Sequence, residues 1–591
     1  MHEIVSPMVG TVVRIAAAGD VVLPGQEVAV LESMKMEHLV HAPSEPSEHP
    51  GFVVAEVAVE RGHGVRRDQV LVRLARRTDS GPTPGGGQQQ PAEPSGTSLR
   101  ADLAAVVAAH AHGLDENRPD AVAKRHARGQ RTARENVADL CDPGTFTEYG
   151  PLVVAAQRAR RSLEDLVAST PADGLVTGLG EVAGRPTAVL AYDATVLAGT
   201  QGLRNHQKTD RMLEVAEKRR TPVVLFAEGG GGRPGDTDVP VVAALDLDTF
   251  YRFARLSGEV PLVGVAAGRC FAGNAALLGC CDVIIATRGA NIGMGGPAMI
   301  EGGGLGTFTP EEIGPAAEQA AAGVVDVLVQ DEAEAVVVAK RCLAYFSGEV
   351  AEEWECGDQD ELRDLVPEQR GRAFDVRRVV HRLADSGSVL ELRRDFGRGI
   401  VTALVRVEGR AYGLVANSTE HLGGAVDGEG ADKMARFLGL CDRHGLPVIT
   451  LCDTPGFMVG PESERSGTVR RFGDLFTTSA RLRVPLLTVV LRKAYGLGAM
   501  AMSGGGHKVP LATVAWPTAE VGAMGLEGAV KLGFRRELEA VADPVERQRF
   551  LEEMVELAHE QSKALNAATV FELDDVIDPA DTRRWITRVL G

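Results

Sequence analysis

Short runs of valine, isoleucine and leucine, separated by glycine turns, dominate the beginning of the chain. Gly10, Gly19 and Pro24-Gly25 break these runs, and such spacing is typical of a compact all-β domain. The segment from Gly19 to Val28 is echoed weakly by the segment from Gly62 to Val70. Two similar halves predict a flattened barrel that spans the start of the chain.

One lysine lies between two methionines inside this predicted barrel, in the sequence Glu32-Ser33-Met34-Lys35-Met36-Glu37. Lysine carries a strongly hydrated charge that avoids burial, whereas apolar residues flank this stretch on both sides. A β-hairpin satisfies both requirements, because its tip exposes the lysine while its strands are buried. We therefore expect Lys35 in a hairpin turn, where the alternative is an ordinary exposed lysine without a special role.

Strands, glycine-rich turns and helices alternate in the second, longer part of the chain, and this is the βαβ pattern of a sheet with crossover helices. The whole set occurs twice, with an offset of roughly 225 residues. We therefore predict a duplicated α/β domain. The expected strands are 223–226, 262–265 and 283–286 in the first copy, and 446–451, 485–490 and 513–517 in the second.

The changes in pattern divide the chain into four segments. Residues 1–75 form the β domain, and residues 76–97 are rich in glycine, proline and glutamine and are expected to be a solvated linker. The duplicated domains follow over residues 98–345 and 346–591. The first of them begins with a helical pattern over residues 99–140.

Composition excludes several classes of protein. A formal charge of −18 over 591 residues argues against a nucleic-acid-binding protein, which would carry a basic surface. No run of about 18 apolar residues predicts a membrane span, and the N-terminus lacks the features of a signal peptide. The eight cysteines include no Cys-x-x-Cys pair, so we expect no metal site and no disulfide framework. Together these features predict a cytoplasmic protein.

The glycine turns are the candidate sites for chemistry. A glycine turn that opens a helix leaves backbone N–H groups free to hold a phosphate or an oxyanion, although a single such turn is as well explained as a helix cap. No typical nucleophile motif is present. His206 and Lys208 are the polar pair that we expect near a phosphate-bearing ligand, and a solvated helix start is the equally good alternative.

The Met-Lys-Met turn, together with Ser6-Pro7-Met8 and Ala42-Pro43, resembles the biotinyl (biotin carboxyl carrier) domain. This resemblance implies that biotin is attached covalently to Lys35 between Met34 and Met36, and that a biotin protein ligase recognises the hairpin. Two departures are Ser33, where the family usually has alanine, and an apparent insertion over residues 44–50.

Five ordered motifs after the linker resemble the carboxyltransferase (β) subunit of acyl-CoA carboxylases. They are Asp173-Gly174-Leu175-Val176-Thr177-Gly178, Asp453-Thr454-Pro455-Gly456-Phe457, Arg492-Lys493-Ala494-Tyr495-Gly496, Ala515-Trp516-Pro517-Thr518-Ala519-Glu520 and Asp575-Val576-Ile577-Asp578-Pro579. The resemblance implies two α/β crotonase-like (ββα superhelix) domains. It also implies a homo-hexamer in which the active sites lie where halves of different subunits meet.

This second resemblance also implies a mechanism. A separate biotin carboxylase, which holds ATP and Mg, carboxylates the biotin, and the carboxyl group then moves from carboxybiotin on Lys35 to the α-carbon of an acyl-CoA. By motif position, Ala272 and Gly273 hold the thioester enolate, while Leu497 and Gly498 hold the ureido oxygen. Further substrate contacts are expected at Gly230, Gly231, His206, Lys208 and Met500.

Departures from the family pattern bear on the substrate. Leu497-Gly498 stands where acetyl- and propionyl-type enzymes usually have Gly-Ala, and Met500 lies at the position that sorts acyl chain length. Both favour a longer or branched acyl group. Three alternatives remain: the α subunit of a biotin-dependent decarboxylase, a transcarboxylase component, and a biotinylated scaffold whose transferase part has decayed.

Overall fold

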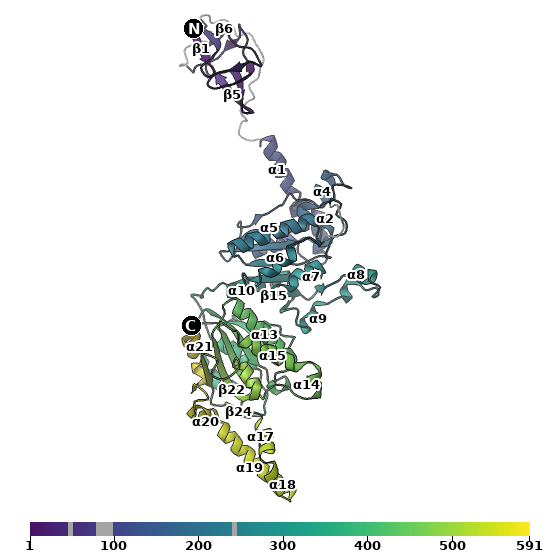
Figure 1. Ribbon diagram of the computed structural model, residues 1–591, viewed down its shortest axis with the longest axis vertical. Coiled ribbons are helices and arrows are strands. Elements are labelled where there is room, and N and C mark those ends of the chain that lie inside the picture. Colours follow the sequence, from purple (N-terminus) through teal and green to yellow (C-terminus); the bar gives the residue numbers. More distant parts are fainter. Residues whose placement is uncertain (45–50, 78–98, 239–244) are drawn as a thin grey trace. The chain divides into compact units, whose positions relative to one another are not determined.

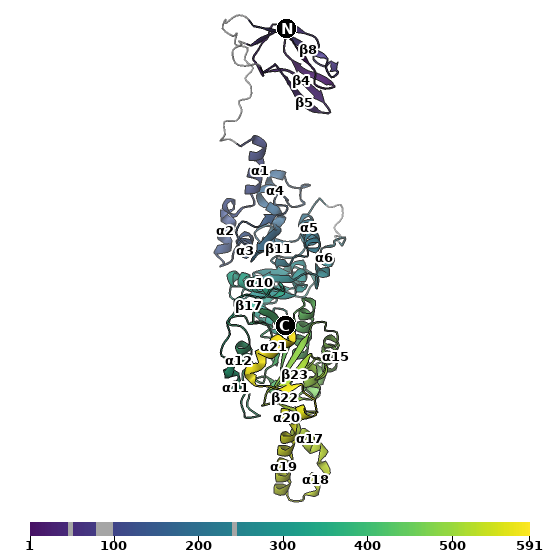
Figure 2. The same ribbon diagram turned by 90° about the vertical axis from the view of Figure 1, so that its left-hand side faces the viewer.

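The computed structural model describes residues 1–44, 51–77, 99–238 and 245–591. These residues form two compact units, Met1–Leu99 and Arg100–Gly591, which are drawn in Figures 1 and 2. The predicted linker from residue 78 onward and residues 45–50 of the apparent insertion lie outside the described residues. Arg76, the first residue of the predicted linker, is instead the end of the last strand of the β domain. No helix in the described ranges is both long and apolar enough to cross a membrane.

Unit 1 consists of two four-stranded antiparallel sheets around one small core, which confirms the predicted all-β barrel. The apolar side chains that alternate along its strands are buried together, among them Val28, Leu31, Leu71 and Leu74. The short strands β3 and β7 come from the two repeated segments, and each lies at an edge of one sheet. The strand orders are β1 (His2–Val5), β8 (Val70–Arg76), β6 (Phe52–Val57), β3 (Val21–Val22) and β5 (Met36–His41), β4 (Glu27–Ser33), β2 (Gly10–Ile15), β7 (Gly64–Val65).

Unit 2 contains two large sheets, one in each half of its sequence. In each sheet an antiparallel hairpin continues into parallel strands joined by helices. All six predicted strands are present, displaced at their ends by a few residues. The first sheet has the order β17 (Val327–Val329), β15 (Val283–Thr287), β13 (Leu262–Ala266), β12 (Val223–Phe226), β11 (Arg185–Tyr192), β10 (Leu175–Val182), β9 (Thr147–Glu148).

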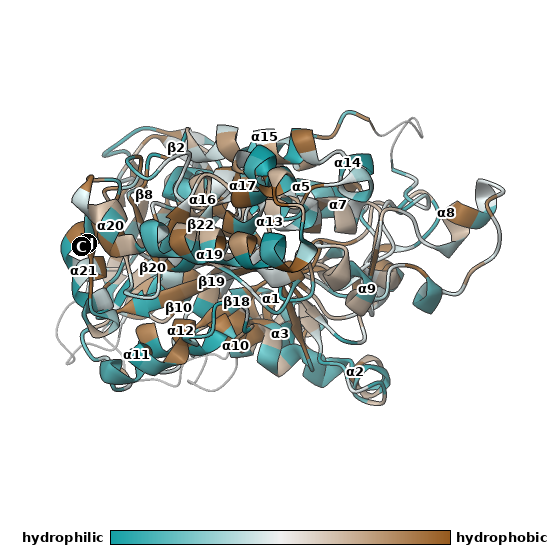
Figure 3. Ribbon diagram, turned by 90° about the horizontal axis from the view of Figure 1, so that it is seen from below, coloured by the Kyte–Doolittle hydropathy of each residue, from teal (hydrophilic) through white to brown (hydrophobic). Residues whose placement is uncertain are grey.

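The second sheet repeats this plan. Its order is β18 (Leu390–Leu392), β19 (Ile400–Val407), β20 (Arg410–Asn417), β21 (Val448–Thr454), β22 (Leu486–Tyr495), β23 (Ala512–Ala515), β25 (Asp575–Val576), and β24 (Glu520–Gly522) also pairs with β22. In Figure 3 strands such as β19 and β22 are coloured mostly as hydrophobic, whereas the helices α2 and α11 carry hydrophilic residues. The α/β class predicted from the alternating pattern is therefore confirmed.

The two halves of unit 2 share a core. Helices α10 (Glu332–Phe346) and α13 (Gly428–Arg443) contribute Val336, Ala339, Met434 and Phe437 to one hydrophobic cluster, and this cluster also contains strand residues from both sheets. The outer face of the first sheet packs against α5 (Leu203–Arg219), α6 (Thr249–Arg255) and α7 (Gly273–Gly279). The outer face of the second packs against α12 (Val376–Leu383) and α21 (Thr582–Leu590).

The continuous helical pattern predicted over residues 99–140 is wrong in one respect, because the structure divides it into three helices. These are α1 (Ala101–Ala111), α2 (Pro119–His126) and α3 (Ala133–Leu140). Pro119 can only begin a helix, since it lacks an N–H, and Thr132 with Glu135 forms a capping box that starts α3. The breaks matter because they bring α2 and α3 beside the first glycine turn.

Candidate functional site

Lys35 lies at the tip of the hairpin between β4 and β5, where Ser33 pairs with Met36. Met34 and Lys35 are the two turn residues and have φ values of 52° and 65°. Two positive φ angles define a type I′ turn, which suits the right-handed twist of the strands. Met34 is 95% exposed and Met36 65%. The predicted hairpin turn is confirmed, and its three central side chains face solvent rather than the core.

This turn satisfies the requirements of a covalent carrier site. Lys35 is exposed and is the only lysine in the first 99 residues. Strands whose inner residues are buried hold the turn on both sides. An enzyme that modifies this ε-amino group therefore finds one accessible lysine on a rigid projection.

The first glycine turn of unit 2 follows β12 and touches the start of α7. An added Cβ at Gly231 would lie 2.5 Å from the Cβ of Ala272 and 3.4 Å from the nitrogen of Gly273. Gly231 also has a φ of 86°, so the position excludes other residues both by space and by backbone conformation. The structure thus brings together three residues that the sequence analysis placed in one site.

The hydrogen bonds at this turn correct one detail of the prediction. The N–H of Ala272 donates to the carbonyl of Gly293 at 3.0 Å, so it is not free to hold a substrate oxygen. The N–H of Gly273 is the first of α7 and has no acceptor within the described ranges. Gly230 and Gly231 donate to Ala198 and to the side chain of Asn274. Gly273 is therefore the available donor of the predicted pair.

The second half repeats this geometry at the start of α16 (Gly496–Met502). An added Cβ at Gly498 would lie 2.5 and 2.7 Å from the backbone carbon atoms of Gly456. The contact of Gly456 with Gly498 thus matches that of Gly231 with Gly273, and both positions are shifted by 225 residues. In the part of the chain that the structure describes, the N–H groups of Leu497 and Gly498 have no acceptor.

The side chains that line the start of α16 are apolar and accessible. Leu497 is 59% exposed, and Met500 on the next turn of the helix is 39% exposed. Met500 is close to Gly506, since an added Cβ there would lie 4.0 Å from its methyl carbon. The flexible Met500 and Leu497 therefore form an apolar border beside the free N–H groups of Leu497 and Gly498. We call this pair of N–H groups the second hole, and the free N–H group of Gly273 the first hole.

Comparison with known proteins assigns both units to families. A family model for the carboxyl transferase domain matches residues 124–590, and a model for biotin-requiring enzymes matches residues 2–74. The chain belongs to the carboxyl transferase family. It is a biotin-dependent carboxyltransferase that carries a biotinyl domain in the same chain, as the two resemblances predicted.

Individual relatives support this assignment. The methylmalonyl-CoA carboxyltransferase 12S subunit of Propionibacterium freudenreichii is 35% identical over 79% of this chain and 90% of that protein. The propionyl-CoA carboxylase β chain of Saccharopolyspora erythraea is 33% identical over 80% and 89%. A solved single-chain, multi-domain long-chain acyl-CoA carboxylase is 55% identical, with a TM-score of 0.80. The carboxyltransferase chain is covered completely by that enzyme but spans only 56% of its length.

The structure does not support His206 and Lys208 as exposed phosphate contacts. Both side chains of this carboxyltransferase are buried. His206 is hydrogen-bonded to Thr249 at 3.0 Å, and Lys208 donates to the backbone carbonyls of Ala172 and Leu175. Burial lowers the pKa of His206 and lowers that of Lys208 to about 8. A solvated helix start therefore describes neither residue. His206 does not line the cleft that lies beside α5, whereas Lys208, although buried, is one of the residues that line it.

Lys433 shows that the buried lysine is a feature of the duplication. It lies 225 residues after Lys208, at the equivalent place on α13, and donates to the carbonyl of Phe396 at 3.0 Å. Burial lowers its pKa to about 7. Each lysine therefore ties the long helix of its half to the loop before the hairpin, which is a structural role.

An arginine-lined cleft is the feature that sequence reasoning missed in this region. It has a volume of about 610 Å³ and lies beside the exposed face of α5, where Arg204 and Arg211 line it together with Arg158. Asp238 also lines the cleft. Arg204, Gln207 and Arg211 are spaced i, i+3, i+7, so they lie on the same side of one helix, and this spacing is the sequence signal for the cleft. Lys208 also lines this cleft, so the positive charge predicted near a phosphate-bearing ligand comes from three arginines together with Lys208, and His206 takes no part.

Proposed function

We propose that the chain is the carrier and carboxyltransferase part of an acyl-CoA carboxylase, with biotin bound to Lys35. One observation carries the proposal: the chain holds an exposed lysine turn and, in its duplicated part, two matching holes with free N–H groups. Carboxyl transfer develops negative charge on two oxygen atoms, the thioester oxygen of the acceptor acyl-CoA and the ureido oxygen of the donor biotin. Each hole can donate hydrogen bonds to one of them.

The Gly273 N–H is proposed to hold the thioester oxygen of the acyl-CoA as negative charge develops on it. Backbone N–H groups at a helix start, together with the positive end of the helix dipole, favour such charge. The Leu497 and Gly498 N–H groups hold the ureido oxygen of the cofactor. Biotin on Lys35 supplies the transferable carboxyl group and a nitrogen that can accept the α-proton of the acyl-CoA. The protein contributes placement and oxyanion support.

We propose that a longer or branched acyl chain, whose thioester is held at the first hole, extends to the apolar border of the second hole. Leu497 and Met500 offer apolar surface beside the hole, and apolar contacts stabilise a bound chain by about 25 cal/mol for each Å² that they bury. The single-chain relative that shares 55% identity is a long-chain acyl-CoA carboxylase. We propose the same class of substrate for this chain.

Further components are needed for the complete reaction. We propose that a biotin carboxylase, which binds ATP and Mg, charges the biotin, and that a biotin protein ligase attaches biotin to Lys35. Transcarboxylase 12S assembles as a hexamer, and we propose a homo-hexamer for this carboxyltransferase as well.

Transfer of label from bicarbonate tests the proposal. The biotinylated chain is mixed with a biotin carboxylase, ATP, labelled bicarbonate and acyl-CoAs from acetyl to long-chain. Acid-stable label on a long or branched acyl-CoA is the expected result. Label that stays on the protein with every acyl-CoA would contradict the proposal and favour a decarboxylase or a transcarboxylase with another acceptor.

The arginine-lined cleft is proposed to bind the phosphate groups of CoA. Arg204→Ala or Arg211→Ala should raise the KM for acyl-CoA about tenfold and leave kcat nearly unchanged, because a charged hydrogen bond to phosphate contributes roughly 1.5 kcal/mol. Steady-state kinetics with acyl-CoA and with its 3′-dephospho analogue measure this effect. The analogue should show a smaller difference between wild type and variants.

Arg219→Ala provides the control, because Arg219 is exposed at the other end of α5 and outside the cleft lining. An equal KM for wild type, Arg204→Ala and Arg211→Ala would refute the cleft as a CoA site. The label-transfer result would still stand in that case.

A further inference from the structure

Each glycine turn of unit 2 begins with a carboxylate that is fully buried in the second half and 14% exposed in the first, and the two halves hold it in different ways. In the second half this residue is Asp453, at the end of β21. Arg492 on the neighbouring strand β22 lies 3.0 Å from one oxygen of Asp453, and Lys493 lies 3.1 Å from the other. The carboxylate is thus fixed by two cations from the adjacent strand.

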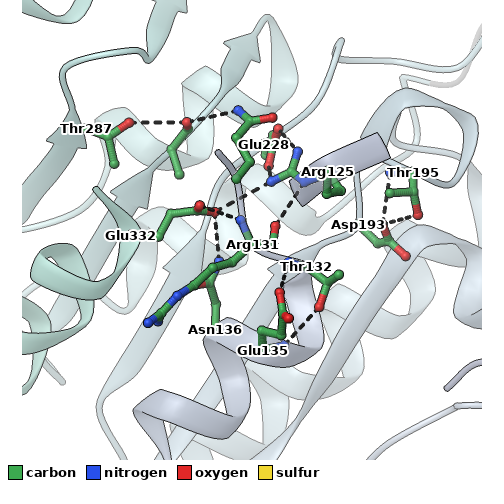
Figure 4. A network of polar contacts seen from close by, with 12 residues as sticks. Arg125, Arg131, Thr132, Glu135, Asn136, Asp193, Thr195, Glu228, Thr287 and Glu332 are labelled. Atoms are coloured by element: carbon green, nitrogen blue, oxygen red, sulfur yellow. Dashed lines mark hydrogen bonds and ion pairs between the residues drawn. The ribbon is translucent and has the colours of Figure 1, made fainter. Parts of the chain in front are cut away.

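The first half lacks this arrangement on its own strands. The position equivalent to Asp453, 225 residues earlier, is Glu228, but the position equivalent to Arg492 is Ala267. The missing cation comes instead from α2, where Arg125 donates two hydrogen bonds to Glu228 at 2.6 and 2.9 Å. Figure 4 shows this pair at the centre of a polar network. Arg125 and Ala267 line the same small cavity.

The network around Arg125 holds its guanidinium in one orientation. Its Nε donates to the carbonyl of Arg131 at 2.9 Å, and Glu332 lies 3.5 Å away on the other side. Glu332 in turn accepts from the backbone N–H of Arg131 and from Asn136. Burial alone would lower the pKa of Arg125, but the hydrogen bonds and charge of Glu228 raise it. The side chain therefore stays charged in a buried, bidentate pair.

Glu228 connects this pair directly to the first hole. Its carboxylate lies against Gly268, where an added Cβ would be 2.2 Å from the Oε1 atom. The next residue, Gly229, donates to Arg269 at 2.7 Å and accepts from Phe271 at 2.9 Å. Phe271 leads into Ala272 and Gly273. A displacement of Glu228 would thus be passed through two backbone hydrogen bonds to the start of α7.

We infer that Arg125 is a positioning residue for the first hole, and that it replaces from another helix the cation that the second half supplies from β22. This inference rests on the proposed function, because it assumes that the first hole holds the acyl thioester. It assigns catalytic importance to the 119–132 segment, which the sequence analysis treated only as part of a helical pattern.

Arg125→Gln and Arg125→Lys test the inference in the full chain with its biotin carboxylase. Both variants should lower kcat for acyl-CoA carboxylation by roughly tenfold to hundredfold, since small misplacements of a reacting group have effects of this size. The KM for acyl-CoA should change less than about twofold. Arg125→Lys keeps the charge but loses the bidentate fork, so it should be impaired even if its thermal stability equals that of wild type.

A second measurement separates positioning from general loss of structure. In hydrogen-exchange mass spectrometry, peptides that cover residues 228–233 and 269–276 should exchange faster in the Arg125 variants, while peptides from 453–458 and 492–500 should not change. Arg128→Gln is the matched control, because Arg128 is exposed just after α2. It should leave kcat and exchange at the wild-type values.

Rescue provides the sharpest test. The triple variant Arg125→Gln, Glu228→Asp, Ala267→Arg rebuilds the arginine–aspartate pair of the second half, without its lysine, in the first half. Its kcat should be at least fivefold higher than that of Arg125→Gln. A folded Arg125→Lys with wild-type kcat, or a triple variant no better than Arg125→Gln, would overturn the inference. Wild-type protein that carboxylates no acyl-CoA would instead refute the proposed function.

Discussion

Lys35→Arg is expected to abolish carboxyl transfer completely. Arginine keeps the positive charge and tolerates the exposed turn, but its guanidinium cannot form the amide bond that attaches biotin. No other lysine exists in the first 99 residues, so no neighbouring amine can substitute. Streptavidin blotting should show no biotin on the variant, and the label-transfer assay should show no labelled acyl-CoA.

Lys124→Arg is the matched control, since Lys124 is an exposed lysine on α2. It should carry biotin and transfer label as the wild type does. Streptavidin-reactive Lys35→Arg protein would show that biotin is attached elsewhere, and the assignment of Lys35 would then be wrong.

Gly498→Ala should lower kcat by about a hundredfold or more, the effect expected when an oxyanion hole loses a donor. The added methyl group would lie 2.5 Å from the carbonyl carbon and 2.7 Å from the Cα of Gly456, and 2.9 Å from the nitrogen of Phe457. These are backbone atoms that cannot rotate away, so the start of α16 must shift from the turn that it contacts. Single-turnover transfer of label from the biotinylated chain to acyl-CoA measures the loss.

Gly473→Ala serves as its control, because Gly473 lies inside α15 (Thr468–Ser479) and an added Cβ meets no atom within 4 Å. That variant should retain wild-type transfer. Both variants should still carry biotin and accept label from the biotin carboxylase, because neither change touches unit 1. Wild-type transfer by a folded Gly498→Ala protein would show that this hole does not act in the reaction.

The sequence was most informative where local chemistry determines local structure. The contrast between a hydrated lysine and its apolar flanks predicted the hairpin at Lys35, and the turn is where the pattern required. Runs of β-branched residues that end in glycine predicted all six strands of unit 2. The glycine turns marked the two places, and the resemblance to carboxyltransferases pointed to Gly231, Gly273 and Gly498 within them. An added Cβ at each of these three would meet neighbouring atoms at 2.0–2.5 Å.

Sequence reasoning failed where the decisive partner is distant along the chain. His206 and Lys208 carry the right charges for a phosphate site, but the packing of α5 buries them against a loop. Ala272 has the expected motif position, but its N–H is used by Gly293. The break of the helical pattern at Pro119 is, in contrast, a local feature, because a proline inside a helical pattern ends the helix before it.

The sequence by itself determined the two classes of domain, the exposed lysine turn and the places of the two glycine holes, because period, turn chemistry and steric limits are local properties. Only the tertiary structure decided which N–H groups remain free and which cations hold the turns. Arg125 and Glu228 are separated by 103 residues, and no local pattern links them. Their pairing arises because the first half has alanine at the place where the second half has Arg492, and the fold brings α2 to that position.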